Sequence, residues 1–277
     1  MQCAGNRRVD MVEVKYVSGD AWQPGAISNA MWTGVSLREV LHAAGIAPAN
    51  GLHVAFTGHD VIHEEGETFN FGVSIPIAKA MQDDTILAFE MNGEPLTPEH
   101  GFPLRLVTPG FAGVRSPKWL ATIVVQNHPS NNHIQQKEYK LYPPEVTKAT
   151  AVPSAGMVIN DMPLNSAICD PSEGATLQSG SNRLRGYAIS TKSPVTRVEV
   201  SPDGGNTWTH ARLEPQQNAA WSWVFWSAQI DLTPGPSQLV VRAFDRSGAT
   251  QPPHTADIWN YAGYLSRAWH RVNVGVS

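Results

Sequence analysis

The second half of the chain alternates short β-strand patterns with turns, and this feature constrains the fold most strongly. Asp203-Gly204-Gly205 has turn chemistry, and the final Val272, Val274 and Val276 repeat with the period of two that a strand with one buried face requires. The other strand patterns cover residues 196–201, a segment containing Trp208, and residues 221–230 and 238–244. About seven short strands between turns are typical of an immunoglobulin-like sandwich, so an all-β domain is predicted here.

The first half mixes helix and strand patterns. Ser36 and Glu39 have the spacing of a helix-capping box, and apolar residues then follow at helical spacing as far as Gly45, which suits a left-handed C-cap. Asn92-Gly93, which follows the strand pattern of residues 86–91, predicts a hairpin turn. Further strand patterns cover residues 52–56, 104–108 and 119–126. We therefore expect an α+β domain.

The 277 residues exceed the usual size of one hydrophobic core, so two domains are expected. Between residues 142 and 171 the sequence is rich in Pro, Ser, Ala and Thr and has weak periodicity, which predicts a surface connector. We place the boundary near Pro143, which gives domains of residues 1–142 and 143–277.

The net charge of −4 and the pI near 6.2 give no broad positive field, so neither nucleic acid nor an anionic membrane is expected as a partner. No apolar run approaches the length of a membrane-spanning helix, and the first residues lack the apolar stretch of a secretory signal. The chain as given is expected to be soluble, and its compartment stays unknown.

Cys3 stands close to two guanidiniums, those of Arg7 and Arg8. Neighbouring positive charge favours the thiolate, which is the form that binds metals or attacks electrophiles. A small buried cysteine beside solvated arginines fits these residues equally well. A tyrosine-phosphatase site is excluded because Val9 stands where that motif needs its arginine. The remaining histidines lack the spacing of a zinc site, so no second metal is predicted.

The string Cys3-Ala4-Gly5-Asn6-Arg7-Arg8 closely resembles the molybdenum-cysteine motif of the sulfite oxidase family. Further motifs of that family follow in the same order along almost the whole chain, which makes the resemblance far more specific than a single short pattern. They are GAISNAMW from Gly25, FEMNGEPL from Phe89, HGFPLR from His100, KWL from Lys118, KEYK from Lys137, VEVSPDGGNTW from Val198 and AWHRV from Ala268.

The resemblance implies a role for each matched residue. Cys3 is expected to be the protein ligand of molybdenum in a molybdenum-molybdopterin cofactor. The residues implied to hold the pterin and its phosphate are Asp60, His100, Arg105 and Lys118. Those implied to line the sulfite pocket are Arg8, Trp22, Tyr139 and Arg271. Considered without the resemblance, the favoured interpretation of Asp60 is a turn residue and that of Lys118 is a solvated charge.

The implied fold is a molybdopterin-binding oxidoreductase domain followed by an immunoglobulin-like dimerisation domain that pairs two copies. The implied reaction transfers an oxygen atom to sulfite, giving sulfate, and passes electrons to an external acceptor such as a cytochrome. Fixed guanidinium forks suit a small dianion of this kind. Two alternatives remain open: the molybdenum domain of a nitrate reductase, and a non-catalytic dimerising module that has lost its cofactor. The family's N-terminal segment and a haem domain are not found in the chain as given, so the cofactor is expected to bind with fewer contacts.

Overall fold

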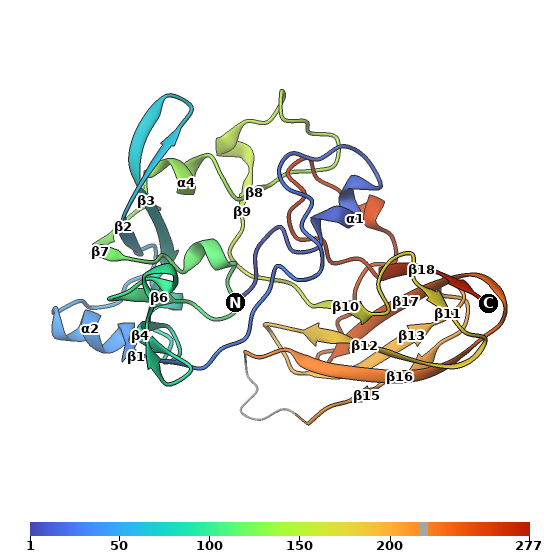
Figure 1. Ribbon diagram of the computed structural model, residues 1–277. Coiled ribbons are helices and arrows are strands. Elements are labelled where there is room, and N and C mark those ends of the chain that lie inside the picture. The colour runs from blue at the N-terminus through green and yellow to red at the C-terminus, as the bar shows by residue number, and fades with distance from the viewer. Residues whose placement is uncertain (216–220) are drawn as a thin grey trace. The chain divides into compact units, whose positions relative to one another are not determined.

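The chain folds into two compact units, and the computed structural model describes residues 1–215 and 221–277 (Figure 1). Unit 1 consists of Met1–Ala4, Ser28–Tyr142 and Ala149–Asp161, and unit 2 of Gly5–Ile27, Pro143–Lys148 and Met162–Ser277. The described structure is mostly β, with few and short helices. The division of the sequence at residue 143 remains a prediction. No helix in the described part of the chain is long and apolar enough to cross a membrane.

Unit 1 combines antiparallel sheets with short helices. Its helices and 3-10 turns are α2 (Leu37–Ala43), α3 (Ile77–Ala80), α4 (His133–Gln136), η1 (Pro98–His100), η2 (Gly113–Arg115) and η3 (Pro153–Ala155). Its strands are β1 (Trp32–Ser36), β2 (His53–Glu64), β3 (Glu67–Pro76), β4 (Ile86–Met91), β5 (Glu94–Pro95), β6 (Arg105–Val107), β7 (Leu120–Gln126), β8 (Lys140–Leu141) and β9 (Met157–Val158). In the described residues they pair as β1-β4-β5 with β6 also on β4, as β3-β2-β7 and as β8-β9.

The predicted helix is confirmed as α2, which buries Leu37 and Leu41 in the core of unit 1. Its capping box is wrong, because the side chain of Ser36 makes no capping hydrogen bond. Ser36 is the last residue of β1, and the backbone N–H of Leu37 instead donates to the carbonyl of Thr85 at 2.9 Å. A backbone acceptor therefore satisfies a donor that the sequence pattern assigned to a side chain.

The hairpin of β4 and β5 is confirmed at the predicted turn, where Asn92 and Gly93 have φ of 56° and 82°. The strand predicted at residues 52–56 is much longer in the structure and continues as β2 to Glu64. Its pairing with β3 shifts register between Thr57 and Val61, where polar residues interrupt the apolar alternation. This irregular segment carries Asp60.

Unit 2 has two sheets that share one core. Its helical elements are α1 (Arg8–Val12) and η4 (Thr255–Ile258), and its strands are β10 (Asn165–Asp170), β11 (Thr176–Leu177), β12 (Gly180–Ile189), β13 (Val195–Ser201), β14 (Thr209–His210), β15 (Arg212–Leu213), β16 (Val224–Leu232), β17 (Gly235–Asp245) and β18 (His270–Val276). In the described residues the orders are β10-β12-β16-β15 and β11-β18-β17-β13-β14. Trp226 of β16 and Val241 of β17 lie in the shared core.

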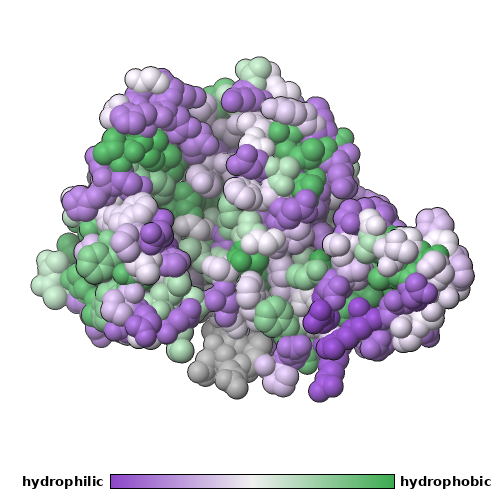
Figure 2. Space-filling view, viewed as in Figure 1, coloured by the Kyte–Doolittle hydropathy of each residue, from purple (hydrophilic) through white to green (hydrophobic). Residues whose placement is uncertain are grey.

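The outer face of the first of these sheets carries exposed arginines on β12. Along β12, Leu184 is fully buried while Arg183 and Arg185 on either side of it are exposed. Figure 2 shows hydrophilic residues gathered over the part of unit 2 where β15 and β16 lie. Buried and exposed residues therefore alternate along the strand, as expected for a sheet with one buried face.

Most of the predicted strands of unit 2 are confirmed, with shifted boundaries. β14 begins one residue after Trp208, and β16 begins at Val224 rather than at Trp221. The predicted surface connector of residues 142–171 is wrong where β10 begins at Asn165, a strand whose first four residues are buried. Arg7 explains this strand, because its guanidinium donates to the Asn165 side chain at 2.7 Å and to the Ser166 carbonyl at 3.0 Å.

Candidate cofactor site

The N-terminal residues of unit 1 are held in place by backbone hydrogen bonds. The amino group of Met1 donates to the carbonyl of Ser28 at 2.7 Å, and the N–H of Gly113 donates to the carbonyl of Gln2 at 2.8 Å. These bonds involve the two residues that precede Cys3, which is partly buried. The candidate molybdenum ligand is therefore carried by a backbone segment with a defined position in unit 1.

Arg105 is a buried cation whose side chain is directed by backbone carbonyls. Its Nη1 donates to the His100 carbonyl at 2.9 Å and its Nη2 to the Ser116 carbonyl at 3.1 Å. The guanidinium carbon lies 4.9 Å from the centre of the Trp32 ring, and Nη2 lies 3.5 Å from the sulfur of Met1. The N-terminal segment that carries the thiol and this cation thus meet within unit 1.

Lys118 lies beside Arg105. Its Nζ donates to the Glu99 carbonyl at 2.8 Å and lies 4.1 Å from the centre of the Trp119 ring. Gly101, with φ of 102°, allows this close packing, because a Cβ at that position would be 2.9 Å from the Lys118 Cβ and 3.2 Å from the Arg105 Cβ. His100, which precedes this glycine, keeps an exposed ring with Nδ1 2.9 Å from the Thr97 hydroxyl.

Burial disfavours the charged forms of both cations. Burial lowers the pKa of Arg105 to about 10. Burial and the positive charge of Arg105 both lower the pKa of Lys118, while the carboxylates of Asp60 and Glu99 act in the opposite direction. Two like charges held side by side in a partly desolvated place form a local positive field that an anion would stabilise.

Asp60 lies close to Lys118 and has an acceptor oxygen without a hydrogen-bond partner among the described residues. This oxygen, Oδ1, is buried. The position is close-packed, because a Cβ on Gly58 would collide with this oxygen and lie 3.0 Å from the Lys118 carbonyl. The N–H of His59 donates to the Trp119 carbonyl at 2.9 Å, which fixes the Asp60 segment next to Lys118.

The structure thus brings together all four residues predicted to hold the cofactor. Arg105 and Lys118 offer the positive charge that a phosphate needs, and the buried Asp60 oxygen offers an acceptor for a ring N–H, since buried acceptors are normally paired. The set fits the phosphate and the pterin of a molybdopterin. Sequence reasoning missed Ser116, whose carbonyl directs Arg105, and Trp32, although this tryptophan ends the GAISNAMW motif.

Tyr139 also belongs to unit 1 and has the unusual backbone φ of 51°. Its carbonyl accepts from the N–H of Ile159 at 2.9 Å. Near it lies Arg115, which is fully buried and donates to the Gln135 side chain at 2.5 Å. Burial lowers the pKa of Arg115 to about 10, and the electrostatic influence of Tyr139 acts in the opposite direction. Arg115 was not predicted, and nothing in its local sequence distinguishes it from an exposed arginine.

The structure places Arg8 in unit 2, in a narrow cradle of glycines. The guanidinium donates to the Asp20 carbonyl at 3.0 Å. A Cβ on Gly5 would be 2.6 Å from its Nη2 and a Cβ on Gly19 2.8 Å from its Nη1, and a Cβ on Gly263 would collide with the Arg8 side chain. Only residues without a side chain leave room for this arginine in its present orientation.

Trp22 and Arg271 are likewise in unit 2, but they are held by different contacts. Trp22 has a 49% exposed side chain, and its carbonyl accepts from the N–H of Val9 at 3.2 Å, directly after Arg8. Arg271 donates to the carbonyls of Pro253 at 2.8 Å and Trp269 at 3.2 Å. Burial lowers the pKa of Arg271. The roles of these residues in sulfite binding remain predictions.

Two family descriptions match the sequence. The family described as "Oxidoreductase molybdopterin binding domain" matches residues 1–134, and the one described as "Mo-co oxidoreductase dimerisation domain" matches residues 156–277. Together they cover most of the chain. The residues Asp60, His100, Arg105 and Lys118 of unit 1 all lie within the range that matches the molybdopterin-binding family.

The chain is also similar to named proteins. It is 42% identical to human "Sulfite oxidase, mitochondrial" over 286 residues, an alignment that covers 100% of this chain and 52% of the human protein. It is 37% identical to "Sulfite oxidase" of Arabidopsis thaliana, covering 98% of this chain and 74% of that protein. It is 39% identical to "Nitrate reductase [NADH] 1" of Phaseolus vulgaris, covering 99% of this chain and 33% of that protein. The chain therefore spans about half the length of the human relative.

A solved structure has the same fold. The sulfane dehydrogenase SoxCD from Paracoccus pantotrophus superposes with a TM-score of 0.79 at 27% sequence identity, covering 100% of this chain and 70% of that one. The likeness extends over both units.

Proposed function

Because the chain belongs to the sulfite oxidase family, we propose that it binds a molybdenum-molybdopterin cofactor and oxidises sulfite to sulfate. The observation that carries the proposal is the cluster of Arg105, Lys118 and the unsatisfied Asp60 oxygen in unit 1. The bound cofactor would supply oxygen-atom transfer and accept two electrons from sulfite. The electrons would then pass to an external acceptor such as a cytochrome.

The residues of unit 1 would hold the cofactor. Arg105 and Lys118 would bind its phosphate as a fork and a point charge, and the His100 ring would add a donor at the exposed edge. Asp60 would accept a hydrogen bond from the pterin. Cys3 would bind molybdenum as the thiolate, since a soft thiolate is the preferred protein ligand for a metal of this kind.

Four residues would act on the substrate. Arg8 is fixed by its glycine cradle, so its guanidinium would bind a small dianion with little loss of side-chain entropy. Arg271 would contribute a second positive charge. The hydroxyl of Tyr139 would donate a hydrogen bond, and the indole of Trp22 would exclude water.

The nitrate reductase alternative has support from the 39% identity to the Phaseolus vulgaris protein. The two activities differ in the direction of electron flow, so one preparation tests both. We expect cofactor-loaded protein to reduce an oxidised dye when sulfite is added. Nitrate-dependent oxidation of a reduced dye, without the sulfite reaction, would replace the sulfite proposal by the nitrate one. An absence of molybdenum after expression in a cofactor-producing host would favour the non-catalytic module.

Unit 2 would be an immunoglobulin-like dimerisation domain. Its two sheets share one core, and its C-terminal segment lies in the family match that carries the dimerisation description. On β16, Val224 and Trp226 are buried, whereas Phe225 between them is 46% exposed and lies 5.2 Å from the Trp223 ring. The exposed Phe225, beside the partly buried Trp223, would be covered by a second copy. Sedimentation of the purified chain is expected to give a dimer at micromolar concentration, and a monomer would refute the pairing.

A further inference from the structure

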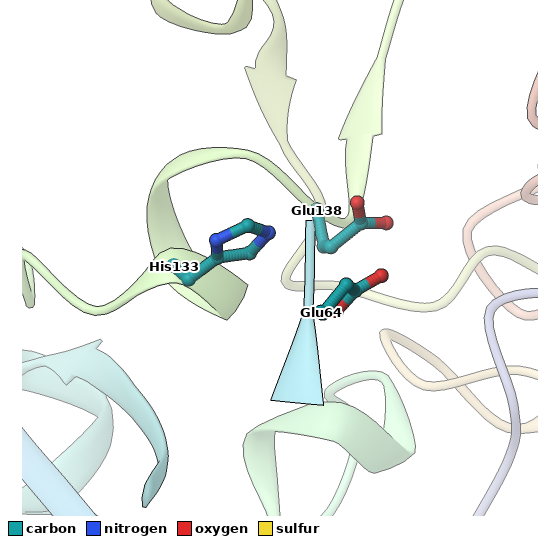
Figure 3. A group of neighbouring side chains, drawn as sticks. All are labelled: Glu64, His133 and Glu138. Atoms are coloured by element: carbon teal, nitrogen blue, oxygen red, sulfur yellow. The ribbon is translucent and has the colours of Figure 1, made fainter. Parts of the chain in front are cut away.

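One histidine and two glutamates gather at the end of the β2–β3 hairpin (Figure 3). Glu64 is the last residue of β2, His133 is the first residue of α4, and Glu138 follows α4 on the chain. One ligand atom from each residue lies within 4.8 Å of the other two. All three residues belong to unit 1, and none has a role in the proposed sulfite reaction.

His133 is buried and aimed at this group. Its side chain is only 3% exposed, and its ring stacks on Phe69 with the centres 4.8 Å apart and an angle of 11°. Its Nδ1 lies 3.1 Å from Oε2 of Glu67, and Nε2 has no hydrogen-bond partner among the described residues. Glu65 has an oxygen 3.9 Å from Nε2, which is too far for a hydrogen bond.

This arrangement prepares Nε2 for a metal. A carboxylate that accepts the Nδ1–H bond fixes the tautomer in which Nε2 carries a lone pair, and metal-binding histidines usually have such a partner. A buried ring nitrogen without a partner also has a cost in free energy, which a metal would remove. Glu67 is therefore a positioning residue, and Nε2 is the ligand atom.

The scaffold that carries His133 is well anchored. Asn132 caps α4 by accepting from the N–H of Ile134 at 3.0 Å, and its amide donates to the carbonyl of Asn70 on β3 at 2.8 Å. The ring therefore has a fixed position relative to the hairpin. Glu64, in contrast, is exposed and free to adjust its rotamer around an entering ion.

The local charge favours a cation. Lys137 pairs with Glu65 at 3.2 Å and with Glu67 at 3.4 Å, so its single positive charge is shared by two carboxylates. The exposed carboxylate of Glu64 adds to this negative group. A divalent ion would offset the excess of negative charge around Lys137.

We propose that Glu64, His133 and Glu138 bind one zinc-type divalent cation, with a water molecule as the fourth ligand. One imidazole and two carboxylates form a donor set that suits Zn²⁺, whereas Mg²⁺ and Ca²⁺ prefer oxygen ligands alone. Tetrahedral zinc needs ligand atoms about 3.4 Å apart, so the three atoms move inward by roughly 1 Å on binding. The ion ties the hairpin to the segment that leads into Tyr139. The site is independent of molybdenum and goes beyond the proposed function.

The test is titration calorimetry of the chelator-treated 277-residue chain with ZnCl₂ and, separately, with MgCl₂. We expect one Zn²⁺ per chain and no binding of Mg²⁺. His133→Gln and Glu138→Gln are each expected to weaken Zn²⁺ binding by about tenfold or more, because each removes a ligand. The matched control is His63→Gln, which removes an exposed histidine of the same hairpin whose Nδ1 lies 2.9 Å from the Thr68 hydroxyl.

Glu64→Gln provides a second variant on an exposed side chain, so the result does not depend on the folding of a variant at the buried histidine. Retention of the Zn²⁺ site in Cys3→Ser distinguishes it from binding by the thiol. Absence of Zn²⁺ binding, equal binding of Mg²⁺, loss of the site in Cys3→Ser, or an unchanged affinity in Glu64→Gln and Glu138→Gln would each overturn the proposal.

Discussion

Replacement of Lys118 by Met should affect cofactor retention and the stability of the cofactor-free protein in different ways. The variant keeps the length of the side chain and removes its charge. In the cofactor-free protein the charge is unfavourable near Arg105, since that neighbour lowers the pKa of Lys118. In the loaded protein the same charge would bind the phosphate. If Lys118 had only a structural role, its replacement would change cofactor retention and the stability of the cofactor-free protein in parallel.

The magnitudes follow from the contacts. The cofactor-free variant loses the hydrogen bond to the Glu99 carbonyl and the contact with the Trp119 ring, each about 0.5–1 kcal/mol at a solvent-exposed position. Relief of the repulsion from Arg105 offsets part of this loss, so the stability should change by no more than about 1 kcal/mol. Loss of one charge-assisted contact to the cofactor costs about 1.5–3 kcal/mol, or about one to two decades of affinity.

The assay is the molybdenum-to-protein ratio after extended dialysis, together with the Tm of the cofactor-free chain. Lys15→Met is the matched control, because the Nζ of Lys15 also lies over an indole, 4.8 Å from the Trp259 ring centre. We expect Lys118→Met to lose molybdenum faster at a nearly unchanged Tm, and Lys15→Met to retain it. Full retention by Lys118→Met, or a loss that parallels an equal fall in Tm, would refute the reasoning.

Two further predictions concern unit 2. Arg8→Met should raise the KM for sulfite about ten- to a hundredfold, because it removes a charge-assisted fork. Gly263→Ala should raise the KM by a smaller factor, because the added Cβ displaces the Arg8 side chain. An unchanged KM in both variants would show that Arg8 does not bind the substrate. The ring of His270 accepts from the N–H of Ile168 at 3.1 Å, and burial lowers its pKa to about 3. Because the unfolded chain then binds more protons than the folded chain, stability should fall by up to about 1.4 kcal/mol per unit as the pH drops from about 6.5 toward 3, and urea unfolding of His270→Asn should show a shallower pH dependence. Equal slopes for the two proteins would contradict the assignment.

The parts of the fold that depend on local chemistry were predictable from the sequence. Asn92-Gly93 accepts positive φ, and β4 ends at this turn as expected. The long second half of β2 was not predictable, because residues 58–60 interrupt its apolar alternation and its pairing with β3 depends on a register shift. β10 was missed for a related reason: the buried side chains of Asn165 and Ser166 are hydrogen-bonded to Arg7 and Gln251, which are distant in sequence.

The candidate site was likewise predictable only in part. Cys3, Asp60, Arg105 and Lys118 were identified from motifs, and the structure brings the last three together. The carbonyls that orient Arg105 have no signature in the sequence, because any residue can supply a backbone acceptor. The site proposed for zinc could not be predicted from the sequence, because Glu64 lies on a strand, His133 lies on a helix, and their spacing follows no local motif.

In the proposed function, the chain binds molybdenum through Cys3 and uses it to oxidise sulfite. The most direct measurement is sulfite-dependent dye reduction, with molybdenum content determined on the same samples, for the parent chain and for Cys3→Ser expressed in a cofactor-producing host. A hydroxyl has nearly the volume of a thiol but is a much poorer ligand for a soft metal, so the fold should persist while turnover is abolished. We expect about one molybdenum per parent chain and sulfite-dependent activity that Cys3→Ser lacks. Unchanged activity in Cys3→Ser, or a parent chain without molybdenum, would contradict the claim.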